Sequence, residues 1–169
     1  YGDLGITGNP HVKTPVIDDF ASESIRFSRF HVSPVCAPTR SSLMTGRYSL
    51  RTGVCDTYNG GAIMAAEEVT IAEMLKQSGY RTGMFGKWHL GADLKYNPIH
   101  HGFDEFNGYL EGAIDYVDHA KTWWQGLEQK DEEGYSTHLI TSHSVRYIEE
   151  HKDEPFCLFV SHEAVHLPW

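Results

Sequence analysis

The feature that most constrains the fold is an uninterrupted apolar run at residues 156–160. It reads Phe-Cys-Leu-Phe-Val, and such a run without polar residues is typical of a strand buried in a parallel sheet. The stretch before it has apolar residues at helical spacing, namely Leu139, Ile140, Tyr147 and Ile148, and Pro155 ends that pattern. A helix followed by a buried strand is the repeating unit of α/β proteins. We therefore predict a central parallel strand at 156–160, after a helix that starts at Ser136 or Thr137.

Helical and extended patterns alternate along the rest of the chain. Two more helices are predicted, one from Thr14 to about Arg26 and one from Thr70, which suits an N-cap, to Gly79. The other predicted strands are residues 27–32 and 80–88, with short strands possible around 103–109. This order indicates α/β layering with right-handed crossovers. Reactive groups in such sheets gather at the carboxyl ends of the strands, which here are the stretches 33–40, 86–91 and 161–168.

The composition excludes several classes of protein. The chain has 169 residues, of which 40% are hydrophobic and 22% charged, as expected of a globular domain. Its net charge of −9 argues against a nucleic-acid-binding surface, although local cations could still bind an anion. The three cysteines, at 36, 55 and 157, do not make a disulfide framework. No apolar stretch approaches the length of a membrane span, so we expect none.

Residues 36–47 carry the strongest chemical signal. Cys36 precedes Pro38, a residue that suits the first turn of a helix, and Arg40 follows one turn later on the same side. Backbone N–H groups at a helix start attract anions, and a thiol placed there ionises more easily than a free one. The pattern indicates a reactive residue beside an anion site. A cysteine phosphatase would need an arginine six positions after the cysteine, where Ser42 stands.

Two other strand ends carry cations and imidazoles. Lys87 and His89 are two residues apart, so they point the same way in an extended chain. A cation beside a titratable imidazole suits an anion that must gain or lose a proton. His162 and His166 follow the predicted strand at 156–160. Their spacing is that of the His-Glu-x-x-His zinc motif, but that motif needs a helix and Pro168 disfavours a helix there, so we discount zinc.

These motifs resemble those of the type I, formylglycine-dependent sulfatases. The run from Cys36 to Arg47 resembles the family signature Cys-x-Pro-x-Arg followed by leucine and Gly-Arg. Residues 86–91 resemble its Gly-Lys-Trp-His-Leu-Gly element, and residues 161–168 its Ala-Pro-His-x-Pro segment, with Val165 where proline is usual. The resemblance extends over nearly all 169 residues. It implies a three-layer α/β/α fold with a mainly parallel central sheet, like that of alkaline phosphatase, and hydrolysis of a sulfate ester.

The resemblance also implies a role for each site residue. Cys36 would be oxidised after translation to Cα-formylglycine, which would act as the nucleophile and also as a calcium ligand. Arg40 would orient the nucleophile, and Lys87 would bind sulfate. His89 would act on the formylglycine hydroxyl and assist sulfate release. His166 would contact sulfate and protonate the leaving oxygen.

The expected cofactors are one Ca²⁺ ion and the formylglycine itself. The family binds calcium through an Asp-Asp pair that would precede Tyr1 and an Asp-Asn pair that would follow Trp169. We therefore expect residues 1–169 to be part of a catalytic domain that is inactive in isolation and binds calcium weakly or not at all. The expected partners are a small-molecule or glycan sulfate ester and a formylglycine-generating enzyme. Periplasmic, secreted and lysosomal-type compartments all suit the family, so localisation stays open.

Two other functions remain open from the sequence. One is a phosphonate monoesterase or phosphodiesterase that uses the same formylglycine, and the other is a non-catalytic anion-binding fragment. Further side chains could face a substrate, although an aromatic cluster is more often packing: Tyr116, Asp118, His119, Trp123 and Trp124. A second group could rim the pocket: Asp56, Tyr58 and Asn59.

Overall fold

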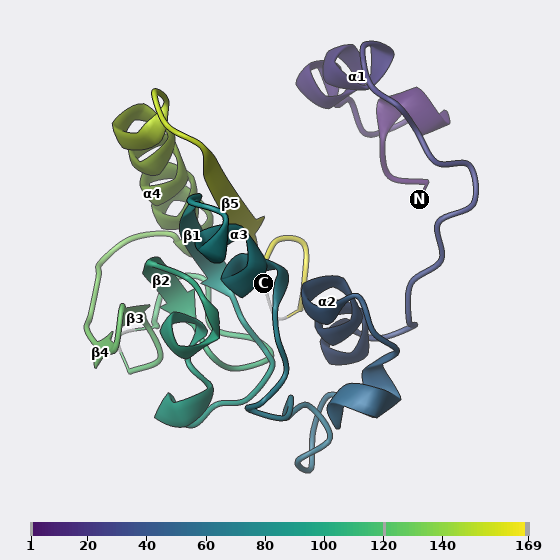
Figure 1. Cartoon of the computed structure of the whole chain (residues 1–169). Coiled ribbons are helices and arrows are strands. Elements are labelled where there is room, and N and C mark those ends of the chain that lie inside the picture. The colour runs from purple at the N-terminus through teal and green to yellow at the C-terminus, as the bar shows by residue number, and fades with distance from the viewer. Residues whose placement is uncertain (1, 120, 168–169) are drawn as a thin grey trace. The chain divides into compact units, whose positions relative to one another are not determined.

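The computed structural model describes residues 2–119 and 121–167 (Figure 1). The described residues form two compact units, one up to Val32 and one from Ser33 onward. No helix within the described ranges is long and apolar enough to cross a membrane.

The first unit is a short helical segment with its own polar contacts. Helix α1 spans Pro15–Ser22, so it begins as predicted and ends four residues early. The Thr14 hydroxyl donates to Asp18 Oδ1 at 2.8 Å, and that oxygen also accepts from the Ile6 N–H at 2.8 Å. The predicted strand at 27–32 is wrong: these residues form no strand, and the side chains of Phe27 and Phe30 are exposed.

The second unit is built on a five-stranded sheet with the order β4-β3-β2-β1-β5. Strand β1 pairs in parallel with β2 on one side and with β5 on the other, and the short β3–β4 hairpin continues the sheet antiparallel beyond β2. The mainly parallel sheet is therefore confirmed, whereas the hairpin was not predicted. Their bounds are Arg81–Lys87 for β1, Glu105–Tyr109 for β2, Trp124–Gln125 for β3, Glu128–Gln129 for β4 and Phe156–Ser161 for β5.

Among the described strands, β5 lies at the edge of the sheet rather than at its centre, which corrects the prediction made from its apolar run. Most of its side chains are half-buried. The run was long enough to indicate a strand, but it contains no information on which neighbours pair with it. Strand β1 is the middle one of the three parallel strands, and its residues after Arg81 are buried.

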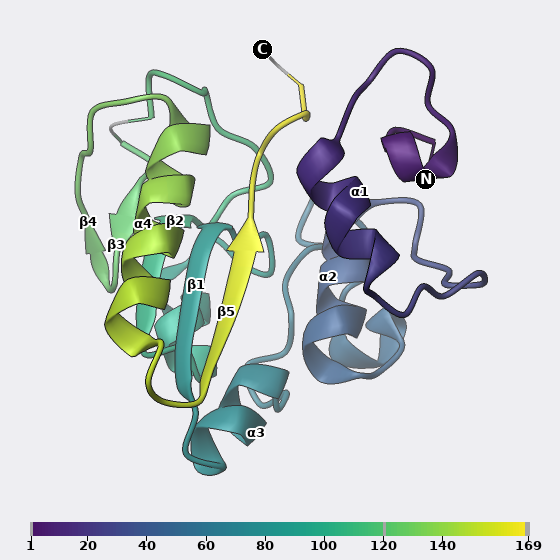
Figure 2. The same cartoon turned by 90° about the horizontal axis from the view of Figure 1, so that it is seen from above.

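Helices cover both faces of the sheet, giving the three predicted layers. Neighbouring residues of a strand point to opposite faces, and Met84 and Phe85 belong to different core clusters. The Met84 cluster includes side chains of α2 (Cys36–Thr45) and α3 (Ile71–Gln77). The Phe85 cluster includes side chains of α4 (Ser136–His151). Figure 2 shows α4 lying along β1 and β5, with α2 and α3 away from it.

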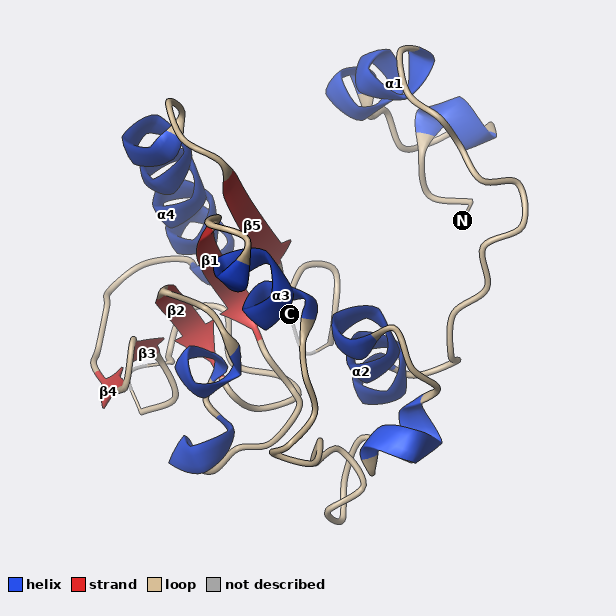
Figure 3. Cartoon of the chain, viewed as in Figure 1, coloured by secondary structure: helices blue, strands red, loops and turns tan. Residues whose placement is uncertain are grey.

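Local sequence signals set the ends of the helices in this unit. Thr70 and Glu73 form a reciprocal capping box at the start of α3, and Gly79, with a φ of 87°, follows its end. Gly46 adopts a φ of 67° and closes α2. Figure 3 shows that most of the chain between α2 and α3 is loop.

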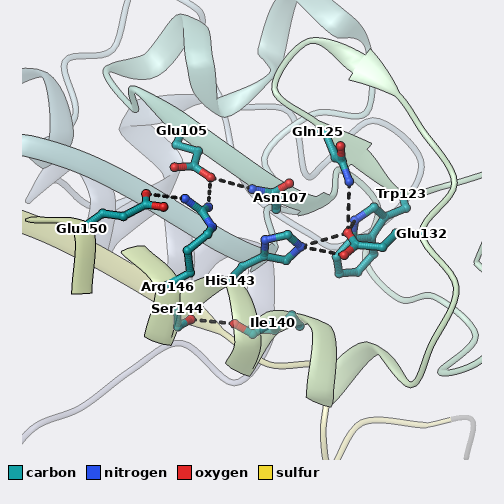
Figure 4. A network of polar contacts seen from close by, with 10 residues as sticks. All are labelled: Glu105, Asn107, Trp123, Gln125, Glu132, Ile140, His143, Ser144, Arg146 and Glu150. Atoms are coloured by element: carbon teal, nitrogen blue, oxygen red, sulfur yellow. Dashed lines mark hydrogen bonds and ion pairs between the residues drawn. The ribbon is translucent and has the colours of Figure 1, made fainter. Parts of the chain in front are cut away.

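Two polar clusters fasten α4 to the sheet (Figure 4). Glu132 accepts hydrogen bonds from Trp123 Nε1 and Gln125 Nε2, each at 3.1 Å, and lies 2.9 Å from His143 Nε2. Arg146 pairs with Glu105 of β2 and with Glu150 one turn further along α4. These contacts hold α4 against the face of the sheet that lies opposite α2.

Candidate active site

The predicted reactive stretches meet where β1 and β5 end beside the first turn of α2. Gly86 allows this arrangement because its φ of 103° suits glycine, and a Cβ there would lie 2.0 Å from the backbone oxygen of Ser161. The two strands therefore approach closely at their carboxyl ends. Lys87 and His89 follow Gly86 directly, and Glu163 and His166 follow Ser161.

Cys36 and His89 are in direct contact. Cys36 is the first residue of α2, and its Sγ lies 3.1 Å from Nδ1 of His89. The other ring nitrogen, Nε2, lies 2.9 Å from the carbonyl oxygen of Thr57. A carbonyl can only accept, so Nε2 carries a proton.

The ring nitrogen of His89 that faces residue 36 is therefore the one free to accept a proton. Burial is the main cause that lowers the pKa of His89 to about 4, with smaller effects from Lys87, Arg40 and His166. The ring is neutral at pH 7, and its unprotonated nitrogen is Nδ1. The backbone of His89 is left-handed, with a φ of 57°, a conformation that non-glycine residues seldom adopt. The fold holds it there through the hydrogen bond from the His89 N–H to the Leu110 carbonyl.

Arg40 ties α2 to both strand ends. Its Nε donates to the carbonyl of Trp88 at 2.5 Å, one terminal nitrogen donates to the carbonyl of Lys87, and the other donates to Ser161 Oγ at 2.9 Å. Burial lowers the pKa of Arg40 to about 10, so the guanidinium stays charged at pH 7. Each of its three nitrogens donates a hydrogen bond to the protein, so Arg40 links α2 to the ends of β1 and β5.

Lys87 supplies a buried cation next to residue 36. Only 5% of its surface is exposed. Burial lowers the pKa of Lys87, while the Cys36 side chain opposes this shift through its charge and a hydrogen bond, and the charge of Glu163 opposes it too. A cation this poorly hydrated interacts strongly with an anion placed beside it.

His166 lies on the loop after β5 with about half of its side chain exposed. Its Nδ1 is 2.6 Å from the carbonyl oxygen of Leu167 and 3.3 Å from Oε1 of Glu163. The Tyr116 hydroxyl donates to the His166 backbone carbonyl at 2.9 Å. The structure thus brings the cysteine, arginine, lysine and both histidines of the sequence prediction to one edge of the sheet.

Two residues of this region were not singled out from the sequence. Glu163 is buried and accepts a hydrogen bond from the hydroxyl of Tyr109, the last residue of β2. Glu163 stands in the quoted strand-end segment, and an acidic residue three positions before His166 was an available signal. Tyr109 offered no such signal, because its place depends on the pairing of β2 with β1.

Most of the additional aromatic candidates pack inside the protein. Trp123 is fully buried, and the centroid of the His119 ring lies 5.0 Å from that of Trp123. Tyr116 stacks on Tyr135 with ring centroids 5.5 Å apart. Tyr58, in contrast, is exposed and lines a pocket of about 300 Å³ that also includes His89 and Glu111. Asp56 and Asn59 are not among the residues that line it.

Cys36 has no set of metal-binding neighbours here. Within residues 2–119 and 121–167, no group of three or more His, Cys, Asp or Glu side chains is arranged to hold a metal ion. A hard cation such as Ca²⁺ takes six to eight oxygen ligands.

Known proteins are similar to this chain in sequence and in fold. The Sulfatase family model matches residues 1–169. Arylsulfatase J of Mus musculus is 33% identical over 99% of this chain and 31% of its own length. The crystal structure of Ps i-CgsB matches with a TM-score of 0.89 at 28% identity, covering 99% of this chain and 43% of that chain. BT4656 in complex with its substrate, D-glucosamine-2-N,6-O-disulfate, matches with a TM-score of 0.82 at 29% identity, over 99% and 33% of the two chains.

The chain spans less than half the length of these relatives. Within that span, the three-layer arrangement with a mainly parallel sheet agrees with the solved structures, which confirms the fold class expected from the resemblance. Because the family model covers the whole sequence, the chain belongs to the sulfatase family.

Proposed function

We propose that this chain forms part of the reaction centre of a sulfuric ester hydrolase whose nucleophile is made from Cys36. One observation supports this most directly: the Cys36 side chain lies 3.1 Å from the unprotonated nitrogen of a neutral histidine, with the buried cation of Lys87 beside it. A base and a cation around one nucleophile suit attack on an anionic ester.

The nucleophile is proposed to be formylglycine rather than the thiol. Converting –CH₂–SH to –CHO removes the sulfur as sulfide in a two-electron oxidation, so a modifying enzyme and its oxidant are needed. As a hydrated aldehyde, residue 36 would supply two hydroxyl groups, one to attack sulfur and one to expel sulfate afterwards. An oxygen in the place of Sγ would lie within hydrogen-bond reach of His89 Nδ1, so the surroundings of Cys36 suit this group.

His89 and Lys87 have distinct roles in this proposal. His89 Nδ1 takes a proton from residue 36, since its Nε2 is held by the Thr57 carbonyl. Lys87 offsets the negative charge on the sulfuryl group as it is transferred. Arg40 fixes the first turn of α2 against the carbonyls of Lys87 and Trp88, which holds residue 36 in reach of both.

His166 is the proposed general acid. Its side chain is about half exposed, so a bound ester can reach it. It contacts sulfate and gives a proton to the leaving oxygen as the S–O bond breaks. Calcium, the family's expected cofactor, would add positive charge beside residue 36, which the family resemblance assigns as one of its ligands.

The proposed substrate is a small-molecule or glycan sulfate ester. BT4656 was solved with a disulfated glucosamine as its substrate, and several curated relatives are named arylsulfatases. The test is a comparison of aryl sulfate and aryl phosphodiester hydrolysis by the full-length protein and its Cys36→Ala variant. We expect faster turnover of the sulfate and its loss in the variant. Faster turnover of the phosphodiester would favour the phosphodiesterase alternative.

A further inference from the structure

A buried carboxylate next to the site has no role in the mechanism above. The Glu163 side chain is fully buried, and its Oε2 accepts the hydroxyl proton of Tyr109. Its Oε1 is buried and has no hydrogen-bond partner among the residues that the structure describes. An ionised oxygen without a partner in such a place is costly, so it is usually retained for a reason.

The unpartnered oxygen lies beside His166. Oε1 of Glu163 and Nδ1 of His166 are 3.3 Å apart, and the His166 N–H donates to the Glu163 carbonyl at 2.8 Å, which closes a tight turn. The Tyr116 hydroxyl holds the His166 carbonyl from the other side. Backbone and carboxylate together therefore restrict where the imidazole can lie.

The proton positions follow from the contacts of the ring. Nδ1 of His166 is 2.6 Å from the Leu167 carbonyl oxygen, which can only accept, so Nδ1 carries a proton. The Nδ1–H therefore has two acceptors nearby, the Leu167 carbonyl oxygen at 2.6 Å and Glu163 Oε1 at 3.3 Å from Nδ1. The ring nitrogen left to face a substrate is then Nε2.

We propose that Glu163 is the positioning residue of the general acid His166. Its carboxylate accepts the Nδ1–H bond, stabilises the imidazolium by charge and directs Nε2–H toward the leaving oxygen, while Tyr109 holds the carboxylate in place. During the reaction the Nε2 proton moves to the leaving oxygen as the S–O bond breaks, and the imidazole becomes neutral. The Nδ1 proton stays on the ring, and Glu163 stays ionised. This inference rests on the proposed sulfatase function.

The leaving group makes the role of Glu163 measurable. An acid contributes most when the leaving oxygen is strongly basic, and least when it leaves readily without a proton. In the full-length protein, Glu163→Gln keeps the size of the side chain and removes its charge. With a series of substituted phenyl sulfates, we expect it to lower kcat/KM by about 10- to 100-fold for the most basic phenols. For nitrophenyl sulfate the loss of kcat/KM should be only a few-fold, so kcat/KM of the variant should depend more steeply on leaving-group basicity than that of the wild type.

Companion variants separate positioning from a general structural role. Glu163→Asp should restore part of the loss, and Glu163→Gln should add little to a His166→Asn background, because the two residues act as one unit. Tyr109→Phe keeps the ring packing and should also make the dependence of kcat/KM on leaving-group basicity steeper, with a smaller loss of kcat/KM than in Glu163→Gln. This variant preserves the test if Glu163→Gln folds poorly. Glu105→Gln, at the opposite end of β2, is the matched control and should not change the dependence.

Two results would overturn the assignment. If Glu163→Gln lowers all rates by the same factor, or by nothing, while the wild type is active, Glu163 does not act through His166. If the wild-type protein, with residue 36 modified, hydrolyses no sulfate ester, the proposed function fails together with this inference.

Discussion

Nδ1 of His89 and Sγ of Cys36 lie 3.1 Å apart although 53 positions separate them in the sequence. The contact joins the first residue of α2 to the chain leaving β1. Ala37 of α2 and Trp88, the neighbour of His89, are both fully buried in the same core cluster. Packing of this core therefore sets the distance between the proposed nucleophile and its base.

Replacing the base should separate catalysis from stability. His89→Asn removes the imidazole but retains a residue that tolerates the left-handed backbone at this position. We expect kcat for an aryl sulfate to fall by about 10²- to 10⁴-fold, with little change in the denaturant midpoint. His89→Ala should lose the same activity and also stability. Equal kcat for wild type and His89→Asn would exclude His89 as the base.

Removing the buried cation should affect the rate and not the fold. Lys87→Met keeps the length of the side chain, and a buried charge is costly to keep, so we expect stability to be unchanged or higher. The loss of charge stabilisation should lower kcat by about 10²- to 10³-fold. Lys130→Met, at an exposed lysine, is the control for a change of net charge. A similar loss in both variants would refute a specific role for Lys87.

Gly86 should not tolerate a side chain. A Cβ at this residue would meet the Ser161 carbonyl oxygen at 2.0 Å, and the φ of 103° adds strain. We expect Gly86→Ala to lower the free energy of unfolding by about 3 kcal/mol or more, measured by denaturant titration. Gly79→Ala, where a Cβ would meet nothing within 4 Å although the φ is 87°, should cost clearly less. Equal costs would mean that the clash at Gly86 is relieved.

Stability should fall in mild acid through His101. This side chain is 1% exposed, stacks on Trp88 at 5.7 Å, and has no hydrogen-bond partner for either ring nitrogen in the described part of the chain. Burial lowers the pKa of His101 below its ordinary value of 6.5. The unfolded chain therefore binds a proton that the folded protein resists, and stability is lost as the pH falls below about 6.5.

His101→Leu is the variant that measures this effect. Denaturant unfolding at about pH 8 and about pH 5.5 should show a smaller acid-induced loss of stability than in the wild type. His31→Leu, at an exposed histidine that does not contribute to the pKa shift of His101, should leave the pH dependence unchanged. An unaltered dependence in His101→Leu would assign the acid sensitivity to other groups.

Most of the regular structure was predictable because its signals are local. The capping box at Thr70, the glycine after α3 and the apolar side of α4 all act within one or two helical turns. The prediction of a strand at 27–32 was wrong because a strand depends on more than local signals. Its aromatic, partly alternating pattern is compatible with a strand, but a strand also needs a partner, and local sequence does not contain one.

The site residues also divide into those that local motifs identify and those whose place depends on strand pairing. Cys36, Arg40, Lys87, His89 and His166 stand in motifs and could be found by reading them. Tyr109 could not, because it reaches Glu163 only through the register between β1 and β2. The edge position of β5 and the β3–β4 hairpin likewise depend on pairing over long distances in the chain.

The chemical state of residue 36 in active protein tests the central proposal most directly. Trypsin cleaves after Arg29 and Arg40 and releases the peptide of residues 30–40, whose mass can be measured in a preparation that hydrolyses an aryl sulfate. We predict that the active fraction carries an aldehyde oxygen in place of the Cys36 sulfur, and that activity rises in proportion to that fraction. A preparation that hydrolyses the ester while all of this peptide retains its cysteine sulfur would contradict the proposal.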